Sequence, residues 1–123
     1  MEQFLLHRCE YTAENIEVER LKNKFTESFS DTELSIRQVL SEEAYCQDHM
    51  RRLFKQSTGL TPNDYLTEVR LNYAKKLLRE NDKLRYTITE IGAMSGFDCT
   101  DYFSRIFKKK TGKSPTEYIR NPE

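Results

Sequence analysis

The sequence predicts an all-α protein in which two related helix-turn-helix units are joined by a long connecting helix. Its 123 residues suit one domain or two very small ones. A third of them are charged and only 4 are glycine and 3 proline, which favours helices over strands. The other two observations are a repeated segment and matching helix start and stop signals in its two copies.

The repeat joins two stretches of the chain. DHMRRLFKQSTGLTPNDYL (48–66) aligns with DYFSRIFKKKTGKSPTEYI (101–119), 53 positions later, and the two share an Asp, an Arg, a Phe-Lys, a Thr-Gly, a Pro and a Tyr in order. Upstream the match continues at an offset of 52, so the turn of the second copy has one added residue. Because a solenoid needs about three or more repeats, two copies indicate two related helical units.

The first helix is expected over about residues 15–29. Val18, Leu21 and Phe25 recur at i, i+3 and i+7 and therefore share one face. Residues 30–32, Ser-Asp-Thr, then break the helix. The pattern is typical of an amphipathic helix.

Each copy begins with a short helix and a tight turn. The pairs with capping-box spacing that start these helices are Ser35 with Gln38, and Thr87 with Glu90. Gly96 lies in the second turn, where glycine tolerates a positive φ, whereas Ala44 has the equivalent place in the first. The second turn is therefore expected to form with less strain.

A longer helix follows each turn and ends at a glycine, Gly59 in the first copy and Gly112 in the second. Thr61-Pro62 and Ser114-Pro115 then open further helices, since the hydroxyl caps the helix and proline suits its first position. An acid follows in the first turn of both, near the positive end of the helix.

The connecting helix is expected over residues 62–80. One apolar stripe is Leu66, Val69, Tyr73 and Leu77, and the other is Leu71, Ala74 and Leu78. A helix that is apolar on two sides is packed on two sides, as a rod held by both units would be. At ~1.5 Å per residue it is roughly 28 Å long, close to the ~34 Å between successive major grooves on one side of DNA.

The two long helices of the repeat have matching faces. The side chains expected to be buried are Met50, Leu53 and Phe54 in the first copy and Phe103, Ile106 and Phe107 in the second. The side chains expected to point outward are Asp48, Arg51, Arg52 and Lys55, and Asp101, Ser104, Arg105 and Lys108. A single basic face is usually just solvated, but here it recurs at the same helical phase in two turn-linked units.

This recurrence predicts that both faces read DNA in major grooves. An Arg fork suits guanine O6 and N7, an Asp can accept from cytosine N4, and a Ser can serve several bases. The lysines, Lys55 and Lys108 together with Lys109, Lys110 and Lys113, would hold phosphates and make binding depend on salt. Double-stranded DNA is the expected partner.

Charge and composition limit the other classes. The net charge of the chain is zero because residues 1–33, with net −4, balance the remaining residues, with net +4. The three cysteines form no CxxC, and no Cys/His/Asp cluster has ligand spacing, so no disulfide framework, metal or cofactor is expected. The apolar run at residues 4–6 is too short for a signal or membrane span, which favours a reduced, cytoplasmic protein. With no phosphate loop, nucleophile elbow or carboxylate pair apparent, no enzyme activity is expected.

At this level of detail the chain resembles the DNA-binding region of the AraC/XylS family of bacterial transcription regulators. The resemblance covers about residues 17–120 and is most specific in IGAMSGFDCTDYFSRIFKKKTGKSPTEY (91–118), with HMRRLFKQSTGLTPNDYLTEVRLNYAKKLL (49–78) matching the first unit and the connecting helix. It implies seven helices, two helix-turn-helix units, and activation or repression at promoters. RNA polymerase is a second candidate partner.

The resemblance also assigns site residues by position. The base-reading set that it implies is Asp48, Arg51 and Arg52, and Thr100, Asp101, Ser104 and Arg105. The sequence departs from the family pattern at three places, where Leu40 and Gly92 stand for a usual Ala and Ala44 for a usual Gly.

The expected domain organisation has four parts. Residues 1–14 are the tail of a linker from a missing upstream region, 15–61 the first unit, 62–80 the connecting helix, and 81–121 the second unit within a DNA-binding domain of residues 15–123. Such a fragment is expected to be monomeric, and the full-length protein is a candidate dimer. The alternative is a helical protein-interaction module that docks its basic faces on an acidic partner.

Overall fold

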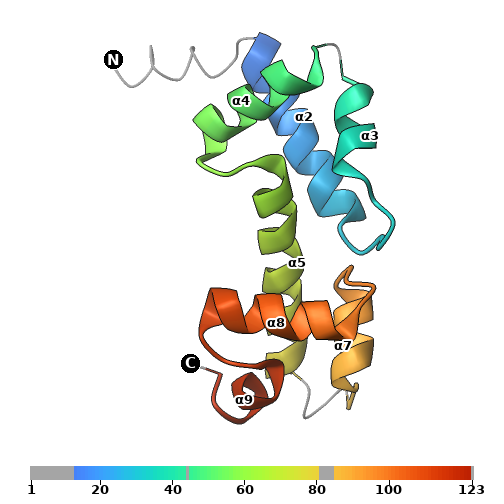
Figure 1. The fold of residues 1–123 in the computed structure, drawn as a ribbon, viewed down its shortest axis with the longest axis vertical. Helices are drawn as coiled ribbons and strands as arrows, with labels where there is room; N and C mark the ends of the chain where they lie inside the picture. The colour runs from blue at the N-terminus through green and yellow to red at the C-terminus, as the bar shows by residue number, and fades with distance from the viewer. Residues whose placement is uncertain (1–12, 44, 81–84, 123) are drawn as a thin grey trace. The chain divides into compact units, whose positions relative to one another are not determined.

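The computed structural model describes residues 13–43, 45–80 and 85–122 of the chain. Within them the chain forms seven helices and no strand (Figure 1), which confirms the predicted all-α class. The helices are α2 (Ala13–Ser28), α3 (Ile36–Ser41), α4 (Gln47–Thr58), α5 (Pro62–Arg79), α7 (Ile88–Met94), α8 (Thr100–Thr111) and α9 (Pro115–Arg120). The prediction for Ala44, and most of the predicted tail at 1–14, fall outside the described residues.

Two compact units make up the described chain. Residues up to Ser28 and from Leu34 to Leu66 form the first, and Phe29–Glu33 with residues from Thr67 onward form the second. The helix α5 therefore begins in the first unit and ends in the second.

The first unit is built around the predicted apolar face of α2. Val18, Leu21 and Phe25 are fully buried, and α2 packs on α4, whose Met50 and Phe54 are equally buried. The rings of Phe25 and Phe54 meet edge to face with centroids 5.9 Å apart, a favoured aromatic geometry. The i, i+3, i+7 pattern of α2 thus identified its buried side.

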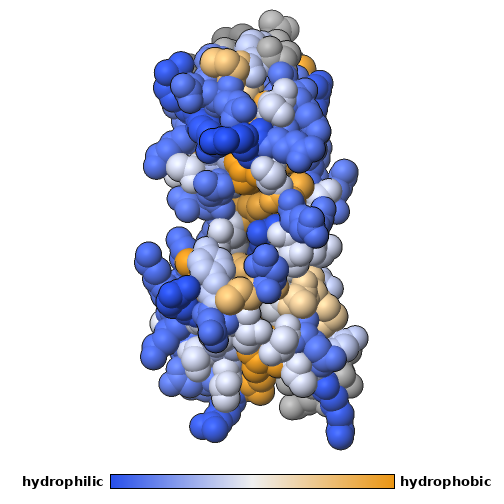
Figure 2. Space-filling model, turned by 45° about the vertical axis from the view of Figure 1, so that its right-hand side comes forward, coloured by the Kyte–Doolittle hydropathy of each residue, from blue (hydrophilic) through white to orange (hydrophobic). Residues whose placement is uncertain are grey.

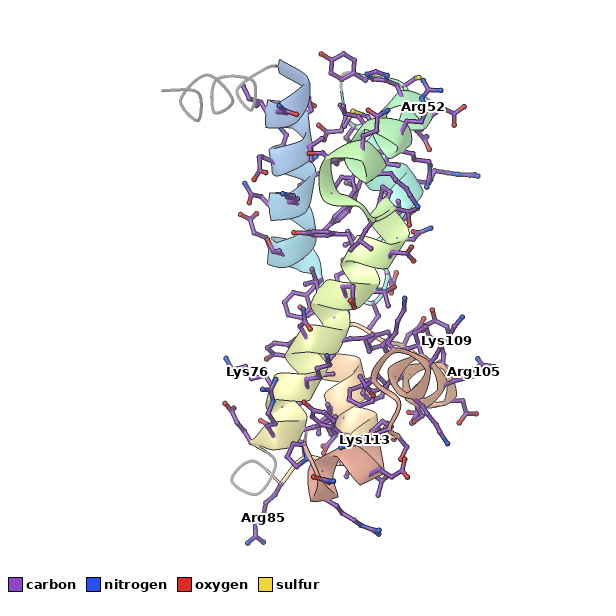
Figure 3. The ribbon with its side chains drawn as sticks, turned by 90° about the vertical axis from the view of Figure 1, so that its left-hand side faces the viewer. Arg52, Lys76, Arg85, Arg105, Lys109 and Lys113 are labelled. Carbon is purple, nitrogen blue, oxygen red and sulfur yellow. The ribbon has the colours of Figure 1, made fainter. Side chains whose placement is uncertain are left out.

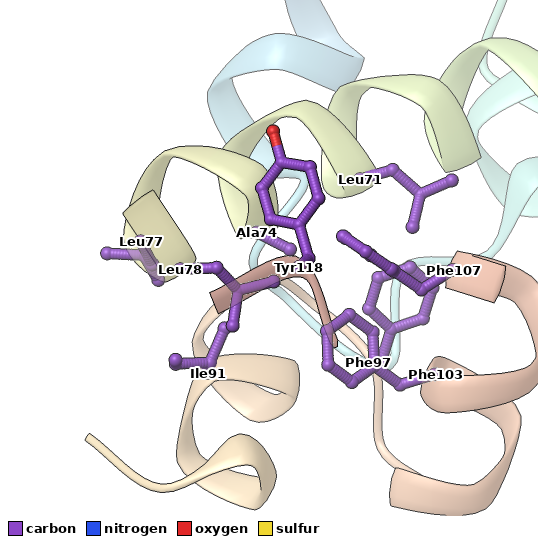
Figure 4. Packing of buried hydrophobic residues seen from close by; sticks show 9 residues of the cluster. All are labelled: Leu71, Ala74, Leu77, Leu78, Ile91, Phe97, Phe103, Phe107 and Tyr118. Atoms are coloured by element: carbon purple, nitrogen blue, oxygen red, sulfur yellow. The ribbon is translucent and has the colours of Figure 1, made fainter. Parts of the chain in front are cut away.

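The second unit has a core of aromatic and aliphatic side chains from four helices and one turn (Figure 4). Its buried members are Leu71, Ala74, Leu77 and Leu78 of α5, Ile91 of α7, Phe97 of the turn, Phe103 and Phe107 of α8, and Tyr118 of α9. Ring centroids 5.1 to 5.8 Å apart join the four aromatic residues in a continuous row. This core fixes the turn against the start and middle of α8.

The repeat extends to the hydrogen bonds that end α4 and α8. Gly59 and Gly112 have φ of 82° and 84°, and each donates its amide to a lysine carbonyl 2.8 Å away, that of Lys55 or Lys108. In both copies the preceding threonine hydroxyl lies 2.8 Å from a Phe carbonyl of the last turn. The shared Thr-Gly of the two copies therefore has one physical role, closing the end of the long helix.

The other predicted helix starts are also present. Thr87 and Ser114 form full capping boxes with Glu90 and Glu117, and Ser35 accepts the amide of Gln38. The backbone amide of Ser114 donates to Glu117, and this hydrogen bond together with that of the Ser114 hydroxyl lowers the pKa of Glu117. These caps set where the short helices begin.

Leu40 and Gly92, which both replace the usual Ala of the family pattern, differ in size together with a second position of the repeat, Met50 in the first unit and Phe103 in the second. A Cβ on Gly92 would lie 2.9 Å from the ring of the buried Phe103. The equivalent positions in the first unit hold Leu40 and Met50, both fully buried. The first unit therefore has Leu40 and the slender Met50 where the second unit has Gly92 and the bulky Phe103.

The turn before α8 is held by an arginine that the sequence did not single out. Gly96 has φ of 100°, and the space beside its Cα is occupied by Arg70 and the Phe29 carbonyl. Arg70 donates from Nε to the Phe29 carbonyl at 2.8 Å and from Nη2 to the Asp31 carbonyl at 2.9 Å. Burial lowers the pKa of Arg70, but an arginine remains charged. Arg70 thereby ties residues 29–31 to the second unit.

Candidate nucleic-acid interface

The outer face of α8 is polar along its whole length. Asp101, Arg105 and Lys108 are exposed and Ser104 is half-buried, on the side opposite the buried Phe103 and Phe107. Lys109 and Lys110 are also exposed and extend the basic end of the helix. Figure 3 shows Arg105 and Lys109 pointing away from the rest of their unit.

Two candidates on this unit are engaged within the protein. The Thr100 hydroxyl, half-buried at the start of α8, donates to the Thr89 hydroxyl of α7 at 3.2 Å. The Lys113 ammonium donates to the Asn121 carbonyl at 2.7 Å. A hydroxyl has one proton to donate, so Thr100 is left with acceptor capacity, whereas an ammonium with three donors retains two for a phosphate.

The outer face of α4 repeats this arrangement in the first unit. Asp48, Arg52 and Lys55 are exposed and Arg51 is half-buried, opposite the buried Met50 and Phe54. Both long helices begin with an acid in the first turn and end with a lysine in the last, which suits the helix dipole. The predicted faces are thus present in each unit at the same phase.

Arg52 and Arg105, the arginines expected to read bases, form no ion pair with an acid in the described part of the chain. In the described part of the chain the ion pairs involve Arg20, Lys22 and Lys24, all on α2. Arg52 and Arg105 lie among the residues that form no hydrogen bond or ion pair there. Their N–H groups are therefore available to an outside acceptor.

Sequence reasoning missed one exposed side chain on this surface. Tyr102 of α8 is 44% exposed. The face of the molecule drawn in Figure 2 is mainly hydrophilic, with hydrophobic patches between the polar side chains. The Tyr102 ring lies near Arg105, whose Cζ is 5.9 Å from the ring centroid. The i, i+3 spacing from Tyr102 to Arg105 was the available signal, because such pairs are neighbours on a helix surface.

The expectation that no carboxylate pair is present was wrong. Glu17 of α2 and Glu43, which follows α3, are both buried, and a hydrogen bond to Glu43 and desolvation raise the pKa of Glu17. Glu17 Oε2 and Glu43 Oε1 are both buried and neither accepts a hydrogen bond. One proton shared between the two carboxyl groups would provide the missing hydrogen bond. Lys24 donates to Glu43 at 2.8 Å and Arg20 lies 3.7 Å from it. Because two cations neutralise the pair inside the α2 packing, we interpret it as structural.

A metal site and a membrane-spanning helix are both absent from the described residues. The described residues contain no group of three or more His, Cys, Asp or Glu that would hold a metal ion. No helix in the described ranges is long and apolar enough to cross a membrane. Cys46 and Cys99 are free, exposed thiols just before α4 and α8.

These features define a class of protein, a DNA-binding domain with two helix-turn-helix units. Over residues 40–121 the chain matches the family described as "Helix-turn-helix domain". It belongs to this family, that of the AraC-type DNA-binding domains of transcription regulators.

Individual relatives agree with this assignment. The transcriptional activator RhaR of Escherichia coli (strain K12) is 28% identical over 120 residues, covering 93% of this chain and 42% of RhaR. The chain thus spans less than half the length of such curated relatives. The C-terminal domain of AraT, a response regulator from Geobacillus stearothermophilus, is 31% identical with a TM-score of 0.77, covering 84% of this chain and 83% of that one.

A more distant structure shares the fold. The DNA-binding domain of the global transcriptional factor AdpA, solved in complex with a target DNA, is 21% identical with a TM-score of 0.75 and covers 86% of this chain and 96% of that one.

Proposed function

We propose that this chain binds double-stranded DNA sequence-specifically by inserting α4 and α8 into successive major grooves. One observation carries the proposal: the same polar face, with an uncommitted arginine, occurs at the same phase on the long helix of both units. The helix dipole accounts for the Asp in the first turn and the Lys in the last turn of both helices, but not for an exposed Arg at the same place between them in each unit. Such a face matches the donors and acceptors of base edges.

The proposed contacts divide into two kinds. Arg52 and Arg105 bind guanine O6 and N7, and Asp48 and Asp101 accept from cytosine N4. Arg51 and Ser104 border these contacts, and Thr100, held by Thr89, would serve as an acceptor. The phosphate contacts come from the lysines near the helix ends, namely Lys55, Lys108, Lys109, Lys110 and Lys113. They set the register and supply most of the non-specific affinity.

The regulatory role follows from the family. We propose that the whole protein regulates transcription at promoters and works in the cytoplasm, where bacterial DNA is found. The proposal is supported by the similarity to RhaR, which is named a transcriptional activator. RNA polymerase is a candidate partner, and the domain acts by binding rather than by catalysis.

The test begins with selection of bound duplexes from random DNA by the complete chain. Affinity for the selected duplex and for a scrambled duplex is then measured at two salt concentrations. We expect preference for the selected sequence and an affinity that falls steeply with salt, with a slope of about −0.9 per phosphate contact. Absence of binding to any duplex at saturating protein would refute the proposal and favour docking on an acidic protein.

The matched variants are R105A and K75A. Removal of a bidentate hydrogen-bonding partner of guanine should reduce discrimination by about 5- to 150-fold, since such a pair is worth about 1–3 kcal/mol. Lys75 is a half-buried lysine on α5 that belongs to neither long helix of the repeat, and K75A should keep the sequence preference. Equal loss in both variants would mean that general positive charge, not base readout, drives binding.

A further inference from the structure

The exposed tyrosine on α8 is tethered to the core of its unit. The Tyr102 ring lies against that of Phe97, with centroids 6.2 Å apart. Phe97 is buried in the turn before α8 and packs on Phe103 at 5.1 Å. The Tyr102 ring therefore contacts the buried core of the unit at Phe97, although the side chain is 44% exposed.

The same ring lies beside the proposed base-reading arginine. Arg105 Cζ is 5.9 Å from the Tyr102 ring centroid, within the ~6 Å at which a cation is attracted to an aromatic ring. A guanidinium is planar and keeps its N–H donors in that plane. Such a contact restrains a long, flexible side chain while its donors stay available to two acceptors of guanine.

The first unit offers a natural comparison. By the repeat, Tyr45 and His49 have the places of Phe97 and Tyr102, and their rings also meet, with centroids 5.1 Å apart. Arg52, the counterpart of Arg105, has no ring contact within the described part of the chain. The aromatic pair is thus repeated, whereas among the described residues the ring-to-arginine contact is found in the second unit alone.

We propose that Tyr102 is a positioning residue for base readout, whose ring pre-orients Arg105 for guanine. This inference rests on the proposed function, because it assigns a role to Tyr102 only if Arg105 reads a base. Pre-organising a side chain reduces the ordering that binding requires and so strengthens the correct contact. The ring, rather than the tyrosine hydroxyl, performs this role.

The experiment uses the complete chain and its selected duplex. The base pair that Arg105 reads is first found as the position whose preference is lost in R105A. The specificity ratio, affinity for the selected base pair over that for a substituted one, is then measured at one salt concentration for the wild type, Y102F and Y102L. The matched control is H49L, the equivalent ring removal in the first unit.

The expected results separate the ring from the hydroxyl. Y102F should keep the ratio, and Y102L should lower it about 2- to 5-fold, the equivalent of an exposed cation–π contact. H49L should leave the ratio at this base pair unchanged. In an R105A background Y102L should have no further effect on it, because the ring acts through the arginine. Thermal unfolding identifies any variant that fails to fold, in which case Y102Q replaces Y102L.

Several results would overturn the inference. One is an unchanged ratio in folded Y102L or Y102Q, and another is a loss in Y102F equal to that in Y102L, which would indicate a hydroxyl contact with DNA. A third is an equal effect of Y102L with or without Arg105. All three would leave sequence-specific binding intact, whereas failure of the proposed function would abolish it in the wild type.

Discussion

The substitution G96A tests the link between the turn before α8 and its support. Two effects add at this position. The φ of 100° places the backbone in a region that costs an L-residue about 1–2 kcal/mol. A Cβ would also lie 2.1 Å from the Phe29 carbonyl and 2.5 Å from Arg70 Nε, a separation that no packed structure tolerates.

The expected loss of stability in G96A follows from the groups that must shift to make room for the Cβ. The Cβ can be accommodated only if the Phe29 carbonyl and Arg70 shift, which breaks or bends the two hydrogen bonds of Arg70 at 2.8 and 2.9 Å. A hydrogen bond to a charged group contributes about 1.5–3 kcal/mol. If the shift costs the equivalent of one of these two hydrogen bonds, the backbone term brings the expected loss in the free energy of unfolding of G96A to about 2.5–5 kcal/mol.

The assay is urea denaturation followed by circular dichroism, with G59A as the matched control. Gly59 has a similar φ of 82°, but no atom lies within 4 Å of the position that a Cβ would take there, so G59A should lose only about 1–2 kcal/mol. In an R70M background G96A should be less damaging, since one obstructing group is gone. Equal losses in G96A and G59A would refute the reasoning, because the close approach of Phe29 and Arg70 would then contribute nothing.

Three further predictions concern the core, the acid pair and the basic end of α8. L40A, at a fully buried position, should cost about 2–5 kcal/mol in urea denaturation; a cost below about 1 kcal/mol would mean that α3 repacks freely. Because the folded pKa of Glu17 is raised above 4.5, the stability it contributes is present below pH 4.5 and lost as pH rises through the folded pKa. E17Q keeps a hydrogen-bond donor at this place, so urea denaturation measured at several pH values should no longer show the free energy of unfolding falling as pH rises. E43Q weakens the interaction with Lys24 and should lower the free energy of unfolding by about 1–3 kcal/mol at neutral pH. The shared-proton interpretation would be contradicted if E43Q removed the pH dependence and E17Q lost stability at neutral pH. Replacing lysines 108–110 by alanine should flatten the slope of log affinity against log salt by about 0.9 for each phosphate that is no longer neutralised, and an unchanged slope would exclude them from the interface.

Much of the fold could be predicted because local patterns determine it. The i, i+3, i+7 spacing of Val18, Leu21 and Phe25 identified the buried face of α2, and the two Thr-Gly sequences identified the ends of α4 and α8. These signals lie within a few residues of the features they specify. The family resemblance added the number of helices, which the structure confirms for the described residues.

The missed features depend on interactions between distant segments. Glu43 is buried because Lys24 and Arg20, about twenty positions away, neutralise it, and no local pattern marks an acid for burial. The partners of Arg70 are backbone carbonyls at Phe29 and Asp31, which have no sequence signature.

The candidate site was predictable in its faces but less so in its details. Helical phase placed Arg52 and Arg105 outward, as the structure finds them. Phase alone did not indicate that the Thr100 hydroxyl is held by Thr89 or that Arg105 lies over the Tyr102 ring. Both depend on how the turn packs against α8.

The most direct test of the central claim is the spacing of the bases that the two units read. Duplexes selected from random DNA by the wild type, R52A and R105A would be sequenced and compared. If the two units read neighbouring major grooves, the selected duplexes should contain two short preferred elements about 10 base pairs apart, one helical turn, and R52A should lose one element and R105A the other. A single element, or loss of the same base pairs in both variants, would contradict the claim.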